Sequence, residues 1–100
     1  MRLTLITIAI EFEWDSGNQD KNWIKHHVSL KEIEEVFFNK PLLINRDITH
    51  SVLEKRFIAY GHTNQARQLI IVFTMRKQMI RAISARDQNK KERAFYETNS

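Results

Sequence analysis

A chain of 100 residues with 42% hydrophobic residues, two glycines and one proline is long enough to fold around one core, so we predict a single domain over residues 1–100. The absence of cysteine excludes disulfides and thiolate metal sites. The net charge is +4, and residues 51–100 hold ten Lys and Arg against four acids. This asymmetry favours a polyanionic partner, with a merely solvated basic surface as the alternative.

The first residues predict a strand and not a signal peptide. Residues 3–12 are rich in β-branched side chains, and their short apolar run continues into Glu11 and Glu13 without a small-residue cleavage motif. No stretch of the sequence approaches the roughly 18–20 apolar residues that a membrane helix requires. We therefore expect a soluble protein of the cytoplasm, a reducing compartment that suits a chain without cysteine.

Two helices are predicted next. Residues 16–26 are polar, but Trp23 falls where a helix would carry a short apolar stripe. Ser29 and Glu32 then have the spacing of a capping box, which marks the start of a second helix. Its apolar residues recur at three- and four-residue intervals, and Pro41 ends it.

The rest of the chain predicts four more strands and a last helix. A continuous apolar run over residues 69–73 is typical of a central strand that is covered on both faces, and Gly61 is expected to end the strand before it. Asp87 is a candidate cap of the last helix. Together these elements predict an α+β fold: an antiparallel β-sheet with two N-terminal helices and a C-terminal helix. The segments are residues 42–44, 56–60, 69–73 and 79–84 for the strands and 87–97 for the helix.

A two-residue turn at Lys77 and Gln78 would join the last two strands as a hairpin and fix their register. That register pairs Leu69 with Arg86 and brings Arg67 and Arg86 together on one face of the sheet, at the end far from the turn. Two converging guanidinium groups present forked donors that suit a phosphate. We therefore expect an anion site between these two arginines.

The same register pairs Thr74 with Arg81 and places Arg76 and Arg81 on the opposite face. There they are candidates for contacts with RNA phosphates. For Arg67 and Arg86 there is a simpler alternative, since each can pair with a carboxylate such as Glu54 or Glu92 at a strand end.

Other side chains suit chemistry at a phosphodiester. Cleavage through the neighbouring ribose hydroxyl needs a base, an acid and positive groups at the phosphate. His26 titrates near neutral pH, Lys25 can donate a proton or neutralise charge, and Glu54 can orient an arginine or act as a base. An ordinary surface role for the histidine is the alternative. Because His26 and His27 would diverge by about 100° on a helix, no metal site is expected.

Three further positions are candidates for RNA binding. Trp14 and Trp23 can stack on unpaired bases, although core packing is the alternative for both. Lys90 belongs to a basic run on the last predicted helix, where it can contact a phosphate or simply face solvent.

Short sequence blocks recur in a fixed order along most of the chain. They are Phe12-Glu13-Trp14-Asp15, Lys21-Asn22, Lys25-His26 with Val28-Ser29, His50-Ser51 with Glu54, Arg56-Phe57, Arg67 with residues 69–76, Ile80-Arg81, Ile83-Ser84-Ala85-Arg86, and Glu92-Arg93 with Tyr96-Glu97. In order and spacing this set resembles the BrnT toxins, within the broader RelE-like group.

Two positions depart from that resemblance. His27 stands where a glycine commonly follows the Lys-His pair, and Ala66 stands where a glycine often precedes the arginine. Glycine adopts positive φ freely, whereas histidine does so at an energetic cost. We therefore expect the backbone near His27 to differ from that of the family.

The resemblance implies a RelE-like ribonuclease that arrests growth by cutting RNA. It also implies a BrnA-like antitoxin that covers the active surface, repression of operator DNA by the complex of the two, and a site built from Arg and Lys. We expect metal-independent cleavage without a cofactor, with Arg67 and Arg86 at the phosphate, His26 or Lys25 handling protons, and Glu54 orienting or acting as base. The alternatives are a non-catalytic binding module and a corepressor that has lost activity.

Overall fold

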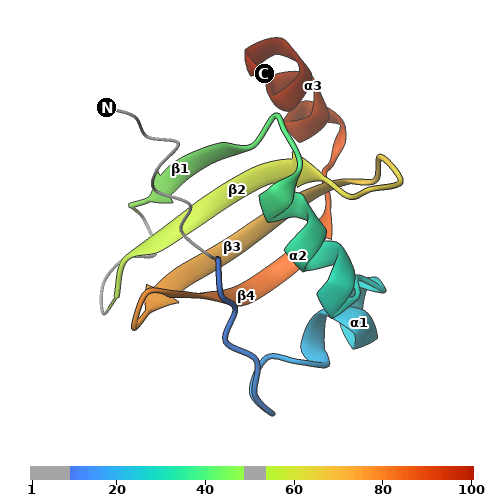
Figure 1. Cartoon of the computed structure of the whole chain (residues 1–100). Coiled ribbons are helices and arrows are strands. Elements are labelled where there is room, and N and C mark those ends of the chain that lie inside the picture. Colours follow the sequence, from blue (N-terminus) through green and yellow to red (C-terminus); the bar gives the residue numbers. More distant parts are fainter. Residues whose placement is uncertain (1–9, 49–53) are drawn as a thin grey trace.

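The predicted α+β class is confirmed by a computed structural model, which describes residues 10–48 and 54–100 (Figure 1). The described strands form one antiparallel sheet in the order β1-β2-β3-β4. In the described part of the chain, no helix is long and apolar enough to cross a membrane. The elements are α1 (Lys21–His26), α2 (Leu30–Phe38), β1 (Leu43–Asp47), β2 (Arg56–His62), β3 (Gln68–Arg76), β4 (Met79–Asp87) and α3 (Lys90–Asn99).

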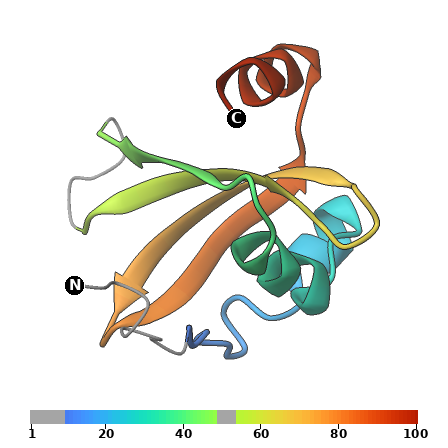
Figure 2. The same ribbon diagram turned by 45° about the horizontal axis from the view of Figure 1, so that its top comes forward.

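The helices lie on opposite faces of this sheet. Helices α1 and α2 cover one face, here called the helix face, and α3 lies over one end of the other, the open face (Figure 2). The core forms on the helix face, where Ile33 and Val36 of α2 and Ile71 of β3 are fully buried. Most of the open face is therefore left without a helix above it.

Glycine 61 does not end β2 as expected. The strand continues to His62, and a Cβ added at Gly61 would lie only 2.7 Å from Cγ1 of Val36. A larger residue would push α2 away from the sheet, because real Cβ atoms do not approach another carbon so closely. This glycine is required by packing between α2 and β2 and not by a turn.

The helix starts were predicted with mixed success. Ser29 and Glu32 form the expected capping box of α2. Helix α1 begins later than expected, since turns occupy the segment before Lys21. The cap of α3 is Asn89, so the assignment of Asp87 is wrong; the Asp87 carboxylate is bound instead by an arginine side chain.

The predicted N-terminal strand and one motif fall largely outside the described residues. Of the strand expected over residues 3–12, the structure describes only the end, where Phe12 forms an isolated parallel bridge with Ile80 of β4. The block His50-Ser51 also lies outside the described residues.

The β3–β4 hairpin has the expected turn but not the expected register at its far end. Lys77 and Gln78 have φ values of 51° and 67°, as a type I′ turn requires. Near the turn Thr74 pairs with Arg81, as predicted. A β-bulge then follows, since Phe73 pairs with Ala82 but Val72 pairs with Ser84. One extra residue in a strand turns every later side chain to the other face.

The turn supplies a stability test. Gln78→Gly should raise the free energy of unfolding by about 0.5–1 kcal/mol, because glycine adopts positive φ without the penalty of a Cβ. Chemical unfolding followed by circular dichroism would measure the change. Met75→Gly is the matched control on the same hairpin: Met75 is exposed but lies in regular strand, so its replacement should destabilise. If both variants lowered the free energy of unfolding equally, the result would contradict the assignment of the turn.

Candidate functional site

Arg67 lies on the helix face and joins three elements. Its Nε and Nη2 donate to the two oxygens of Asp87 at 2.7 and 3.0 Å, and Nη1 donates to both oxygens of Glu32 at 3.1 Å. Nη1 also donates to the carbonyl of His27 at 2.9 Å, and Nη2 to that of His26 at 3.2 Å. All five N–H groups of the guanidinium are therefore engaged, tying α1 and α2 to the end of β4.

These bonds shift the pKa values of the groups involved. The hydrogen bond from Arg67 lowers the pKa of Asp87, and that to Asp87 raises the pKa of Arg67. Partial burial opposes the shift at Glu32, but hydrogen bonds from Ser29 and Arg67 still lower the pKa of this carboxyl. Both carboxylates stay ionised at neutral pH, so the network is fully formed there.

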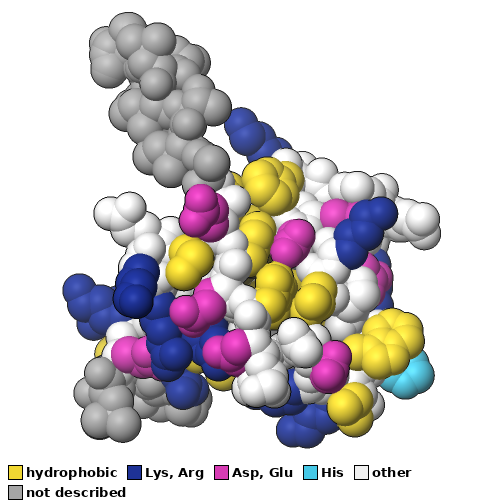
Figure 3. Space-filling view, turned by 60° about the horizontal axis from the view of Figure 1, so that its bottom comes forward, with side chains coloured by type: hydrophobic (Ala, Val, Ile, Leu, Met, Phe, Trp, Pro, Cys, Tyr) yellow, Lys and Arg dark blue, Asp and Glu magenta, His cyan; other side chains and the backbone are white. Residues whose placement is uncertain are grey.

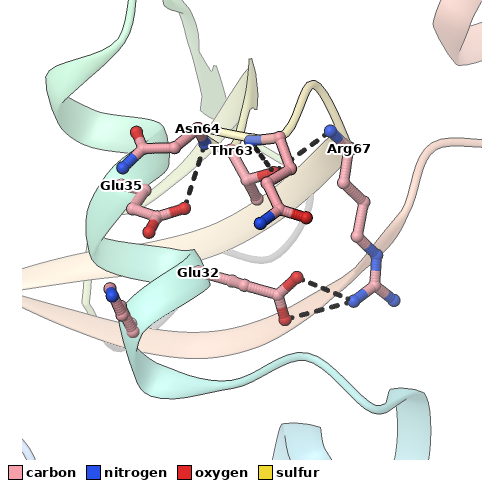
Figure 4. A pocket seen from close by; sticks show the side chains of 7 residues that line it. Glu32, Glu35, Thr63, Asn64 and Arg67 are labelled. Carbon is pink, nitrogen blue, oxygen red and sulfur yellow. Dashed lines mark hydrogen bonds and ion pairs between the residues drawn. The ribbon is translucent and has the colours of Figure 1, made fainter.

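A hollow of about 460 Å³ lies beside this network, between α2 and the β2–β3 loop (Figure 4). Its polar groups mostly bind one another: Glu35 accepts from the backbone N–H of Asn64 at 3.0 Å, and Thr63 Oγ1 accepts from the backbone N–H of Arg67 at 3.1 Å. Figure 4 shows Glu32 facing Arg67 across this hollow. With its arginine fully engaged, this site is poorly suited to an added anion.

Arg86 lies on the open face, so the expected convergence of Arg67 and Arg86 is wrong. Because of the bulge, the partner of Leu69 is Asp87 and not Arg86. Asp87 thus takes the place beside Arg67 that Arg86 was predicted to hold, and the side chain of Arg86 turns to the other side.

The partner of Arg86 is Glu92, as the alternative interpretation held. Its Nη1 and Nη2 donate to the two carboxylate oxygens at 2.8 and 2.9 Å. Glu92 also accepts from the backbone N–H of Asn89 at 2.8 Å, so the same carboxylate caps α3. The hydrogen bond to Glu92 raises the pKa of Arg86, whose side chain nevertheless remains 43% exposed.

A groove of about 410 Å³ runs along the open face beside α3. Its floor is formed by apolar side chains of β2, β3 and β4, and its polar groups include Arg56, Tyr60, Ser84, Arg86 and Glu92. Two guanidinium groups, a phenol and a hydroxyl therefore line one solvent-open channel together with the carboxylates of Asp47 and Glu92. This groove is the candidate functional site, because forked cationic donors over an open channel suit an extended polyanion.

Tyr60 is fixed in this groove by α3. Its ring packs against Phe95 with centroids 5.0 Å apart. Burial and the charge of Glu92 raise the pKa of its phenol, although Arg86 opposes the shift, so the hydroxyl keeps its proton at neutral pH. Nothing in the sequence marks Tyr60 as a candidate, and Arg56 stands there only as part of a family block. Their even spacing with Ile58 along β2 is the signal that places them on one face once the strand is known.

Arg76 and Arg81 lie in a separate charged cluster near the β3–β4 turn. Arg81 binds Asp15 at 2.8 Å and Glu13 at 3.2 Å, whereas Arg76 lies 3.9 Å from Glu13 and 3.6 Å from Glu54. Figure 3 shows acidic and basic side chains interleaved on this face. Glu54 does pair with an arginine, as expected, but at the opposite end of β3 from Arg67.

The remaining candidates divide into packed and exposed side chains. Trp14 Nε1 donates to Glu34 at 2.8 Å and the indole stacks on Phe12, so the packing interpretation of Trp14 is confirmed. Lys25 is exposed and His26 partly buried at the end of α1, and Lys90 is exposed in the first turn of α3. In residues 10–48 and 54–100 no three His, Asp or Glu side chains gather as a metal site.

Comparison with known families decides what kind of protein carries this groove. A family model described as the ribonuclease toxin BrnT of type II toxin–antitoxin systems matches residues 14–92. The chain belongs to the BrnT family. No curated protein matches it. As a BrnT member the chain is a ribonuclease toxin with an antitoxin partner, and the match spans both the Arg67 network and the groove.

Both departures from the BrnT pattern fall at positive φ. His27 has φ 55° and Ala66 has φ 68°. A residue with a Cβ is disfavoured in this conformation by about 1–2 kcal/mol, which glycine avoids. His27 and Ala66 therefore both adopt a conformation that suits glycine, and a difference from the family's backbone near His27 stays a prediction.

The Arg67 network supplies a test of pH dependence. Arg67→Gln should lower the free energy of unfolding by about 2 kcal/mol at pH 7, because two carboxylates and two carbonyls lose their donor. The folded-state pKa values of Asp87 and Glu32 are lowered, so this stabilisation is present above about pH 4 and is lost as pH falls through the folded values. Chemical unfolding at pH 7 and pH 3 would show the difference between wild type and variant shrinking in acid.

Arg46→Gln is the control, since Arg46 is exposed on β1. It should change stability little at either pH. If Arg67→Gln lowered the free energy of unfolding as much at pH 3 as at pH 7, the result would contradict the role of the two carboxylates.

Proposed function

We propose that this BrnT protein cleaves RNA in the open-face groove, through attack of a 2′-hydroxyl on the adjacent phosphate and without a metal ion. The observation that carries the proposal is the grouping of Arg56, Tyr60 and Arg86 in one solvent-open channel. Preorganised guanidinium groups stabilise the charge that builds on the phosphate as the new bond forms. The expected products are a 2′,3′-cyclic phosphate and a free 5′-hydroxyl.

Each group in the groove has a proposed part. Arg86 and Arg56 bind the phosphate oxygens, since a guanidinium can offer two parallel donors. The Tyr60 hydroxyl, protonated at neutral pH, donates toward the leaving 5′-oxygen. In the free protein Glu92 occupies the donors of Arg86 that the phosphate takes in the complex.

The candidates outside the groove take other parts in this proposal. Arg67 is a positioning residue, because its donors are all engaged by the protein itself. The proton of the attacking 2′-hydroxyl passes to the Glu92 carboxylate, which lines the groove and is released when the phosphate takes the donors of Arg86. Proton transfer by Lys25 or His26 and a base at Glu54 stay predictions. Arg76, Arg81 and Lys90 remain candidates for contacts with RNA phosphates.

The proposed partners follow from membership of the BrnT family. A BrnA-like antitoxin would neutralise the protein in the cytoplasm, and the complex would repress operator DNA. A non-catalytic binding module is the second candidate, favoured by one observation: Arg67, Arg76, Arg81 and Arg86 are each paired with carboxylates. The Arg86 side chain is 43% exposed, however, and a phosphate, which also accepts two parallel donors, can replace its carboxylate partner.

Purified protein should cleave single-stranded RNA in the presence of EDTA. Arg86→Ala should lower the cleavage rate by about 10²–10³-fold, as removal of one donor to a developing oxyanion does elsewhere. Gel analysis with mapping of the new 3′ ends would measure both effects. Cleavage that stops in EDTA would refute the metal-independent mechanism, and binding without any product would favour the second candidate.

Lys31→Ala is the matched control for this experiment. Lys31 is an exposed cation on α2, which covers the helix face. The variant loses the same charge without touching the groove and should cleave at the wild-type rate. A similar loss in both variants would show that overall charge, and not the groove, controls the reaction.

Glu92→Gln tests whether the carboxylate competes with phosphate. Glutamine keeps the capping box of α3 but removes the negative charge, so RNA affinity should rise several-fold. Glu97→Gln, the same change on the same helix away from Arg86, should have a smaller effect. Fluorescence anisotropy with a non-cleavable RNA would measure the two affinities, and equal changes would indicate long-range electrostatics alone.

A further inference from the structure

Helix α1 presents an indole ring to solvent. Trp23 is 55% exposed and the neighbouring Ile24 is 75% exposed. The indole lies against the imidazole of His27, with ring centroids 5.1 Å apart and planes 22° from parallel. Trp14, by contrast, is packed and hydrogen-bonded. Trp23 therefore forms with His27 a stacked pair of rings, an aromatic surface that the core does not use.

This aromatic surface is held rigidly by the helix beneath it. Asn22 is buried, and its Oδ1 accepts from the backbone N–H of Ala85 in β4 at 2.9 Å. At the other end of α1, the carbonyls of His26 and His27 accept from Arg67. A stacking surface that is already ordered loses little conformational entropy when a ligand binds.

The backbone at His27 favours the same interpretation. Its φ of 55° would be less strained with glycine, but glycine would remove the ring that lies against Trp23. The strained residue thus supplies half of the aromatic surface.

The charge around the rings suits a polyanion. Lys21 and Lys25 are exposed on α1, and neither forms an ion pair with another described residue. The nearby carboxylates of Asp87 and Glu32 are bound by Arg67. Asp20, at the start of the helix, is the opposing exposed charge. Figure 3 shows histidine and hydrophobic side chains adjoining at this surface.

The position of α1 also fits an extended strand that leaves the groove. Strand β4 is an edge of the sheet, and Ala85, which binds Asn22, is the residue before Arg86. Arg86 faces the groove while α1 lies on the other face of the same strand. A nucleic-acid chain that crosses the β4 edge would pass from one to the other.

We propose that Trp23 and His27 form a stacking subsite for an unpaired RNA base across the β4 edge from the cleavage groove, with Lys21 and Lys25 at the adjoining phosphates. Aromatic side chains stack on any base, while lysines bind the backbone, so this subsite strengthens binding of single-stranded RNA without sequence selection. The inference rests on the proposed ribonuclease function, whose groove lies on the opposite face.

The test is binding of a fluorescent single-stranded RNA with 2′-O-methyl riboses, which cannot be cleaved. Trp23→Ala should weaken affinity by about 10-fold, the loss of one stacked base, and Trp23→Phe should restore most of it. Ile24→Ala is the control, since Ile24 is the next residue and more exposed but has no ring. Thermal unfolding of each variant would confirm that the fold is intact.

Cleavage kinetics separate this subsite from the groove. With long RNA, Trp23→Ala should raise KM and leave kcat unchanged; with a dinucleotide, which fills only the groove, it should change neither. The subsite would be overturned if Trp23→Ala bound RNA with wild-type affinity, a result that would favour a protein partner for the ring. It would also be overturned if Ile24→Ala lost as much RNA affinity as Trp23→Ala. Trp23-dependent binding without cleavage would support the subsite while refuting the catalytic groove.

Discussion

One guanidinium group determines how the helices sit on the sheet. Arg67 donates to the carboxylates of Glu32 and Asp87 and to two carbonyls at the end of α1. It thereby joins α1, α2 and the end of β4, and the hydrogen bond from the Ala85 N–H to Asn22 is a second link between α1 and β4. The left-handed turn at His27 lies at the carbonyls that this network binds, and its N–H also caps α1 on the carbonyls of Asn22 and Trp23. Arginine suits the position because it is planar, always charged and carries five donors.

A single β-bulge then divides the arginines between two faces. By inserting Ile83, it places Asp87 beside Arg67 and turns Arg86 into the groove. The helix face therefore carries the Arg67 network, in which every donor is engaged and which stabilises the fold. The open face carries the Arg86–Glu92 pair, whose arginine is half-exposed and whose carboxylate a phosphate can replace. Separation of this kind would let the proposed RNA-binding surface change its partners without loosening the helices.

Family motifs indicated which residues matter, but not what each one does. Arg67 and Arg86 both belong to the ordered set that resembles BrnT, yet one is a positioning residue and the other lies in the groove. Tyr60 is a candidate because it lines the groove, where the ring of Phe95 in α3 packs against it. Of the two tryptophans, Trp14 was the RNA-binding candidate and Trp23 was expected in a buried stripe, but the structure packs Trp14 and leaves Trp23 55% exposed.

Local signals sufficed wherever the interacting residues lie close in the chain. The sequence by itself determined the order of the elements, the capping box at Ser29 and Glu32, the turn at Lys77 and Gln78, and the family. The tertiary structure alone decided the register beyond the bulge, the ion-pair partners and the ring left exposed on α1. The physical reason is that strand alternation has a period of two, so one extra residue reverses every later side chain, and no local pattern in this chain marks where that residue is inserted.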